Sequence, residues 1–241
     1  MKKINFKTSI GTVLVAMFLT MSCSKILEEH PRGIYEPGYF KTEKGVRGGL
    51  TAMYAFLRDI YGQGYYFNIC ETGTDEYTYG SDSDSNFKDA DMTSGGQMTP
   101  STSRADVIWN VGYTIINTAS GVIENASEVG LDASLIAEAN FFRAFHYFSL
   151  VQTFGGVPLD LGSGELKFNT KPTRVSVRNT VPEVYTKAIF PDLKQAIADL
   201  PVSPRITFGG LTKTVARLYL AKAYLTYGWW LQNPNNIPTY P

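Results

Sequence analysis

The segment 133–154 constrains the fold more than any other part of the sequence, because it is long and apolar nearly all the way round. Most of it reads EANFFRAFHYFSLVQTF, and Gly155 and Gly156 then stop it. A helix with apolar side chains on most faces has to be buried on most faces. The sequence therefore predicts a helix that other helices surround.

Other segments with helical periodicity supply those neighbours. Thr42 is a plausible N-cap for a helix that runs through Ile60. Helical spacing returns in the segments 104–127, 182–199 and 212–231. Pro191 is expected to kink or split the helix over 182–199. The segments 62–103 and 160–180 have no helical period. We therefore predict an all-α domain over 43–241, built of helical hairpins with long irregular loops.

The last predicted helix also matches the first helix of a tetratricopeptide repeat. Leu220 and Ala221 stand at the Leu-Gly positions of that repeat, Tyr224 at its aromatic position and Gly228 at the later small position. The small Ala221 would allow a neighbouring helix to come close. One such match is weak, but together with two helical hairpins it indicates a tetratricopeptide-like scaffold.

The beginning of the chain has the features of a secretory signal. Lysines at positions 2, 3 and 7 precede a short apolar run over 10–19, which is too short to span a bilayer comfortably. Ser22 and Cys23 then resemble the cleavage and lipidation site of a bacterial lipoprotein. We predict a lipoprotein signal peptide over 1–22, acylation of Cys23, and a lipid-anchored tether over 23–42. The alternative is an ordinary secreted protein, with Cys23 inside the discarded signal.

The charge balance argues against two classes of function. Lys plus Arg and Asp plus Glu both number 22, so the formal net charge is zero. Nucleic-acid-binding proteins and polybasic membrane-surface proteins usually carry a basic surplus, and neither class is expected here.

Aromatic and amide or carboxylate side chains gather in the loop 62–103 and at the start of the following helix. This combination suits carbohydrates, because aromatic faces stack on sugar C–H surfaces and polar groups bind hydroxyls. The predicted ligand-binding residues are Asp75, Tyr77, Tyr79, Asp82, Asn86, Trp109 and Asn110. Packing of Trp109 within the hairpin is the alternative for that residue, and a structural turn is the alternative for Asp75.

No metal, cofactor or catalytic motif is recognised. The loop with Asp82, Asp84, Asp89 and Asp91 lacks the Gly and Glu that an EF-hand needs, although another calcium site and a solvated acidic loop both stay open. Nucleotide-binding and nucleophile-elbow motifs do not occur. We predict a protein that is not an enzyme and holds no cofactor.

Some polar residues are expected to be structural. Glu138 and Arg143 lie five positions apart and do not face each other on a helix, so each is expected to pair with another helix. His146 is expected to be a hydrogen-bonded core residue. Cys70, with apolar neighbours, is expected to be buried and inert.

Many of these residues, in this order, resemble the SusD/RagB family of Bacteroidetes outer-membrane lipoproteins. The most specific part is the segment 138–159. The other matching pieces are 27–31, Tyr39-Phe40, Thr42-Glu43, 53–58, 74–76, the set Trp109, Tyr113, Ile116 and Asn117, 183–185, Asp192-Leu193, Leu200-Pro201, and Thr212-Lys213 followed by the helix to Leu225. Ala119 departs from the family, which commonly has Asn there.

The resemblance implies a tetratricopeptide-like scaffold that lies over a TonB-dependent, SusC-like transporter and captures oligosaccharides or peptides for import. It implies an outer-membrane location, with a lipid anchor and the domain facing the cell exterior. Family members are usually much longer, so the chain is expected to be an N-terminal, incomplete part. A helical-repeat scaffold that binds another protein and, less favoured, a glycoside hydrolase are the alternative functions.

Overall fold

The computed structural model describes residues 38–83, 88–91, 99, 105–171, 176–205 and 209–234. The predicted signal peptide 1–22, the lipidation site Cys23, and Asn86 and Asp84 lie outside these residues. The described part of the chain contains helices and no strand, apart from one isolated bridge between Asp160 and Glu165. The prediction of an all-α fold is confirmed.

The helices follow the predicted segments closely. The longer ones are α2 (Glu43–Tyr61), α5 (Ala105–Asn125), α6 (Ala133–Phe154), α8 (Phe190–Asp199) and α9 (Lys213–Gln232). The shorter ones are η2 (Tyr39–Lys41), α3 (Gly64–Glu71), α7 (Val181–Glu183) and the π-helical η4 (Val184–Ile189).

Side-chain caps explain why the helix starts could be predicted. The Thr42 hydroxyl accepts a hydrogen bond from the Gly45 N–H at the start of α2. Asp132 accepts one from the Ser134 N–H at the start of α6, and Thr212 caps α9 in the same way. Each cap satisfies a backbone donor that the first helical turn leaves unpaired.

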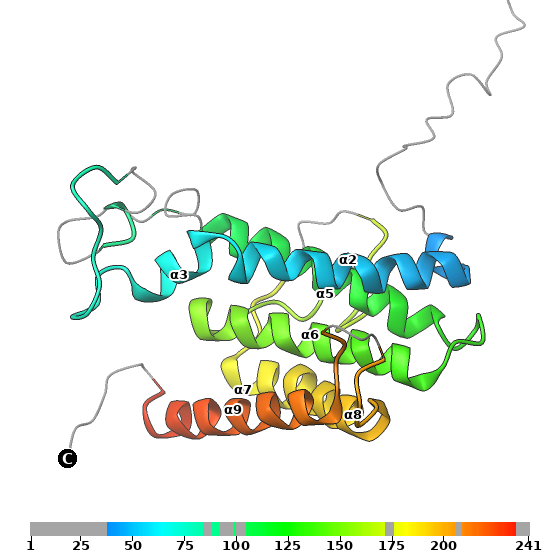
Figure 1. The fold of residues 1–241 in the computed structure, drawn as a ribbon. Coiled ribbons are helices and arrows are strands. Elements are labelled where there is room, and N and C mark those ends of the chain that lie inside the picture. The colour runs from blue at the N-terminus through cyan, green and yellow to red at the C-terminus, as the bar shows by residue number, and fades with distance from the viewer. Residues whose placement is uncertain are drawn as a thin grey trace, which may run out of the picture. The chain divides into compact units, whose positions relative to one another are not determined.

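Helix α6 lies in the middle of the helical domain. It contacts α5 on one side and η4 and α8 on the other, while α2 packs on α5 and α9 packs on α8 (Figure 1). Every residue of α6 from 137 to 151 is buried. The apolar pattern therefore predicted both the helix and its central position.

The two charged residues of α6 pair with other elements, as expected. Arg143 donates to both carboxylate oxygens of Asp192 on α8, from Nε at 2.6 Å and from Nη2 at 2.8 Å, and its Nη1 donates to Ser120 Oγ on α5 at 3.2 Å. Glu138 accepts from Tyr54 on α2 and forms an ion pair with Arg205. These bonds tie α6 to the elements on both of its sides.

The predicted helix 182–199 is divided, as the proline suggested. Pro191 has no backbone N–H, so the carbonyl four residues before it cannot receive the regular helical bond. The preceding turn is π-helical, with the Phe190 N–H donating to Tyr185 O, and Pro191 lies in the first turn of α8. The chain remains helical through the division.

The helix α3 lies inside the segment 62–103, which the sequence predicted to be without helix. It spans only two turns, GYYFNICE, and is too short to display a periodicity. Cys70 on this helix is exposed, so the expectation that it is buried is wrong. Phe67 lies three residues before Cys70 on the same face of the helix, and it is exposed as well.

Phe40, near the end of the predicted tether 23–42, packs against the helical domain. Phe40 is buried at 1% exposure, and its ring lies against Phe168. A Cβ atom added to Gly49 on α2 or to Gly121 on α5 would come within 2.7 Å of that ring, so these glycines provide the space that the ring occupies. Phe40 therefore belongs to the packed core of the helical domain.

The outer side of α9 is apolar and exposed. Only Ala216 and Ala223 are buried on this helix, whereas Leu218, Leu225 and Trp229 are 56%, 76% and 53% exposed. Ala221 is exposed as well. Among the described residues, the helix that the small Ala221 was expected to allow does not cover it.

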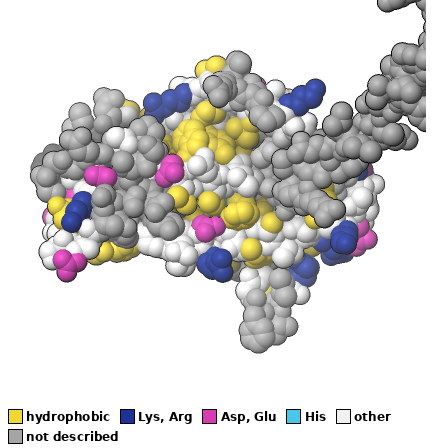
Figure 2. Space-filling view, turned by 90° about the horizontal axis from the view of Figure 1, so that it is seen from above, with side chains coloured by type: hydrophobic (Ala, Val, Ile, Leu, Met, Phe, Trp, Pro, Cys, Tyr) yellow, Lys and Arg dark blue, Asp and Glu magenta, His cyan; other side chains and the backbone are white. Residues whose placement is uncertain are grey.

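One face of the surface is shown from above in Figure 2. Hydrophobic side chains gather near its middle, and basic and acidic side chains are interspersed around them. Among the described side chains of this face, the basic ones are scattered and do not form the continuous region that nucleic acids require. Among the described helices, none combines the length and hydropathy needed to cross a membrane.

Candidate binding site

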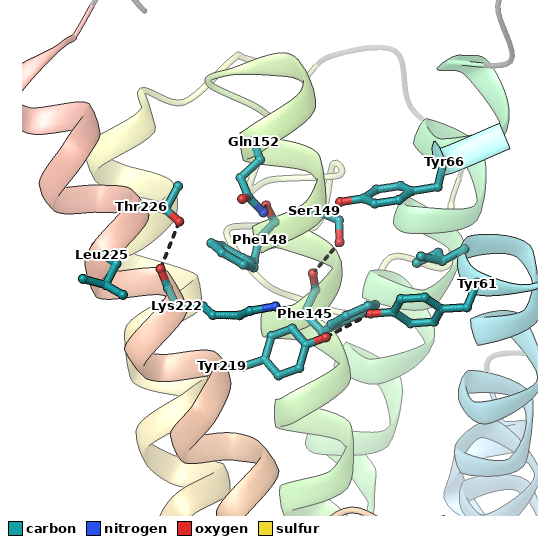
Figure 3. Close-up of a pocket in the computed structure, with 11 residues that line it drawn as sticks. Tyr61, Tyr66, Phe145, Phe148, Ser149, Gln152, Tyr219, Lys222, Leu225 and Thr226 are labelled. Carbon is teal, nitrogen blue, oxygen red and sulfur yellow. Dashed lines mark hydrogen bonds between the residues drawn. The ribbon is translucent and has the colours of Figure 1, made fainter. Parts of the chain in front are cut away.

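A pocket of about 390 Å³ opens between the end of α2, the start of α3, and the helices α6 and α9 (Figure 3). Its volume falls within the range of small-molecule sites. The described lining residues are Ile60, Tyr61, Tyr66, Phe145, Phe148, Ser149, Gln152, Tyr219, Lys222, Leu225 and Thr226. We call this site the tyrosine pocket.

Helical spacing brings the lining side chains to one side of α6 and one side of α9. On α6 the polar positions 149 and 152 lie three apart, and on α9 positions 219, 222 and 226 lie within two turns. Residues three or four apart share a helix face. The end of α2 and the start of α3, which the turn 62–63 joins, add a third wall with Tyr61 and Tyr66.

Two tyrosine hydroxyls close one end of the pocket. Tyr61 on α2 and Tyr219 on α9 are hydrogen-bonded through their hydroxyl oxygens at 2.9 Å. The ring of Tyr219 packs edge-on against Phe141 and Phe145 of α6, with both centroid distances at 5.3 Å. Because those phenylalanines are buried, the position of Tyr219 is set by the core.

Apart from Lys222, the remaining polar groups of the pocket are neutral. Ser149 Oγ donates to Phe145 O, and Gln152 Nε2 donates to Phe148 O, so α6 itself orients both side chains. No described residue donates to the amide oxygen of Gln152. Burial and the neighbouring Cys70 raise the pKa of Tyr66 to about 12, so its hydroxyl remains protonated and can donate.

The pocket therefore offers aromatic faces, hydroxyl groups, one amide and the ammonium group of Lys222. Aromatic faces with neutral hydrogen-bonding groups bind sugars. No Asp or Glu is among the described lining residues. Glycoside hydrolysis uses a pair of carboxylates that flank the reacting bond, and this arrangement of residues offers no such pair.

The predicted loop residues lie outside the tyrosine pocket. Tyr77 packs edge-on against Phe67 of α3 at a centroid distance of 4.9 Å, and Lys88 Nζ lies 5.9 Å from the centre of the Tyr79 ring. Asp75 and Asp82 are exposed. The structure thus keeps these loop side chains at the surface, while Asn86 lies outside the described residues.

Trp109 is partly buried in the packing between α5 and α6. Its ring lies 4.8 Å from that of Tyr113 and 5.2 Å from that of Phe154. The neighbouring Asn110 has an exposed side chain. The alternative reading of Trp109 as a packing residue of the hairpin therefore has structural support.

The sequence reasoning did not identify the tyrosine pocket. Tyr61 and Tyr219 are 158 positions apart, and no local pattern connects them. A signal was present only in α6, where Ser149 and Gln152 are polar positions near the end of a helix that is apolar on most faces. The polar interruptions on a buried helix could have marked a cavity.

The acidic loop shows no assembled metal site in the part that is described. Asp91 is buried and accepts a hydrogen bond from Thr78 at 2.6 Å. Within the described ranges, no group of three or more His, Cys, Asp and Glu side chains could hold a metal ion.

His146 is buried, as expected. Its Nε2 has no hydrogen-bond partner among the described residues. Burial lowers the pKa of His146 to about 3, so the imidazole is neutral at physiological pH.

The fold, a set of antiparallel helical hairpins around α6, defines the class of the protein. Residues 45–225 match the SusD-like family that is described as "Starch-binding associating with outer membrane". The chain belongs to this SusD-like family, and the resemblance to SusD/RagB proteins is confirmed.

Curated relatives come from Formosa agariphila. SusD-like protein P38 is 28% identical over 228 residues, covering 91% of this chain and 44% of the relative. SusD-like protein P2 is also 28% identical and covers 90% of this chain and 43% of the relative. The chain thus spans less than half the length of these relatives.

Solved structures share the fold. A SusD superfamily protein from Parabacteroides distasonis has a TM-score of 0.63 and 24% identity, covering 78% of this chain and 40% of that structure. A structure described as a laminarin-binding SusD-like protein has a TM-score of 0.62 and 23% identity, covering 78% and 41%. The tetratricopeptide-like helical fold is therefore the fold of this chain.

Proposed function

We propose that the protein binds oligosaccharides at the cell surface and that the tyrosine pocket takes part in the binding. The observation that carries the proposal is the lining of this pocket, where tyrosine and phenylalanine rings stand beside Gln152 and Ser149. Family membership supports it, as do the names of two related structures, one described as laminarin-binding and one determined with a xylogluco-oligosaccharide.

The predicted loop supplies a second contact surface in this proposal. Tyr77 is 39% exposed and presents part of its ring, and the exposed Asp75 and Asp82 can accept hydrogen bonds from sugar hydroxyls. Tyr79, Asn86, Trp109 and Asn110 complete the predicted set. An extended oligosaccharide can contact more than one such surface.

The proposal includes a place and a partner for the protein. A signal peptide over 1–22 directs export, acylation of Cys23 anchors the chain in the outer membrane, and the domain faces the cell exterior. The bound oligosaccharide is then passed to a TonB-dependent, SusC-like transporter. The family description, which names association with the outer membrane, supports this location.

Calorimetry with a panel of neutral and anionic oligosaccharides tests the proposal. We expect measurable binding to at least one saccharide, weakened by Tyr61→Ala, because the exposed Tyr61 contributes a pocket wall. Tyr224→Ala is the matched control, because Tyr224 is also an exposed tyrosine but lies outside the pocket lining. Equal losses in both variants would place the site elsewhere.

The same panel separates the alternative functions. We propose that the protein releases no product, and a rate of reducing-end release that follows protein purity would favour the glycoside hydrolase. Absence of saccharide binding together with capture of a protein partner would favour the helical-repeat scaffold.

A further inference from the structure

Lys222 is the one residue with a formal charge among the described residues that line the tyrosine pocket. It extends from α9 into the space between Phe148 and Tyr219 (Figure 3). Its Nζ lies 5.4 Å from the centre of the Tyr219 ring, which holds the ammonium group on the pocket side of the helix.

No carboxylate neutralises this ammonium group in the described part of the chain. None of the ion pairs there includes Lys222. Lys167 and Lys187, by contrast, form ion pairs with Glu side chains. The chain as a whole has no net charge. The positive charge of the pocket is therefore a local feature, not part of a general basic surface.

We propose that the tyrosine pocket prefers a saccharide that carries an anionic group, with Lys222 Nζ as its counter-ion. The inference rests on the proposed function and specifies its ligand class. Aromatic walls exclude part of the surrounding water, which strengthens an ion pair within the pocket. The amide oxygen of Gln152 is available for an uncharged hydroxyl group of the same saccharide.

A lysine selects for the charge of a ligand group and places little restriction on the geometry of that group. Its ammonium group is a point charge, whereas a planar arginine would favour bidentate contact with a carboxylate. The shared chemistry of the ligand is therefore a single negative group on a sugar ring. A uronic-acid carboxylate and a sulfate ester both supply it.

A matched pair of ligands tests the inference on the full chain. Calorimetry compares tetragalacturonic acid with its fully methyl-esterified form, which keeps the sugar and removes the charge. A carrageenan tetrasaccharide forms the sulfate arm, and laminarin and xyloglucan oligosaccharides form the neutral arm. We expect at least one anionic saccharide to bind about tenfold more tightly than the neutral ones, as for one charge-assisted hydrogen bond.

Variants that change one charge test whether Lys222 causes the preference for anionic saccharides. Lys222→Met should remove the roughly tenfold preference, Lys222→Arg should retain it, and 0.5 M salt should weaken it. Lys194→Met on α8 is the control with the same change in net charge, since Lys194 is exposed and outside the pocket lining. A preference that survives in Lys222→Met overturns the inference.

The outcomes distinguish the inference from the proposed function. Neutral saccharides that bind as tightly as the anionic ones would contradict the preference and leave carbohydrate binding established. Absence of binding to every saccharide, with the circular dichroism of a folded helical protein, would overturn the proposed function and this inference with it. Carboxylate binding without sulfate binding would restrict the ligand to uronic acids.

Discussion

At the scale of single residues, the guanidinium group of Arg143 joins three parts of the domain. It makes a bidentate contact with Asp192 on α8, a bond to Ser120 on α5 and a bond to Leu166 O in the loop that follows α6. The side chains of Arg143 and Asp192 are only 8% and 6% exposed. Removal of either partner leaves a buried charge without its counter-ion.

Asp192→Ala is therefore expected to lower the free energy of unfolding by about 3–5 kcal/mol. Chemical denaturation monitored by circular dichroism measures this loss. Glu43→Ala breaks the exposed pair with Arg47 and serves as the control, with an expected change below about 1 kcal/mol. A loss of similar size in both variants would contradict the structural role of the buried pair.

The buried imidazole of His146 predicts a dependence of stability on pH. Its pKa in the folded chain is about 3, and the ordinary value of 6.5 applies to the unfolded chain. Below pH 6.5, His146 binds a proton in the unfolded chain but not in the folded chain. The folded chain therefore loses stability progressively as the pH falls from 6.5 toward 3. Between pH 7 and pH 5, His146 therefore lowers the free energy of unfolding by about 2 kcal/mol.

His146→Leu should remove this contribution. Urea denaturation at pH 7 and pH 5 gives the loss of stability for the native chain and for the variant. From pH 7 to pH 5, the free energy of unfolding of the variant is expected to fall by about 2 kcal/mol less than that of the native chain. Identical losses would mean that His146 is accessible to protons in the folded state.

At the scale of helices, local signals were sufficient for the fold and insufficient for the site. The caps Thr42, Asp132 and Thr212 and the apolar pattern of α6 lie within single segments, so the sequence predicted these helices and the burial of α6. The helix α3 was missed because two turns carry too little pattern.

The tyrosine pocket could not be predicted from such local signals. Its walls come from α2, α3, α6 and α9, and their relative rotation depends on packing between distant segments. The same dependence explains α9, where Ala216 and Ala223 are buried and Tyr219 packs against the core. Leu218, Leu225 and Trp229 of the same helix are exposed. The pattern showed that α9 is apolar on one side, but it did not show which side meets the core.

Loss of one buried aromatic ring from the central helix α6 is expected to destabilise the fold. Phe142 has 0% exposure, and its ring packs edge-on against Tyr54 at 4.8 Å. Phe142→Ala is expected to lower the free energy of unfolding by about 3–5 kcal/mol, because the surrounding helices cannot fill the cavity. Phe67→Ala, at a ring that is 50% exposed, should cost less in the same denaturation experiment. A loss below about 1 kcal/mol for Phe142→Ala would show that α6 does not organise the core.

At the scale of the whole molecule, attachment to the membrane depends on Cys23 in our proposal. Metabolic labelling with a palmitate analogue should mark the native protein and leave Cys23→Ala unmarked. Cys70→Ala is the control, because it removes the exposed thiol and keeps the proposed lipidation site. Equal labelling of native protein and Cys23→Ala would remove the lipoprotein assignment.

The central claim is that an oligosaccharide occupies the tyrosine pocket, and side-chain footprinting tests it most directly. Hydroxyl radicals oxidise exposed aromatic and aliphatic side chains, and mass spectrometry locates the oxidation with and without the tightest-binding saccharide of the panel. Tyr61 and Leu225, which are 66% and 76% exposed, report on the pocket, and Trp229, at 53%, reports on a surface outside it. We predict protection of Tyr61 and Leu225 with Trp229 unchanged. Protection confined to Tyr77, or equal oxidation of every residue with and without the saccharide, would contradict the claim.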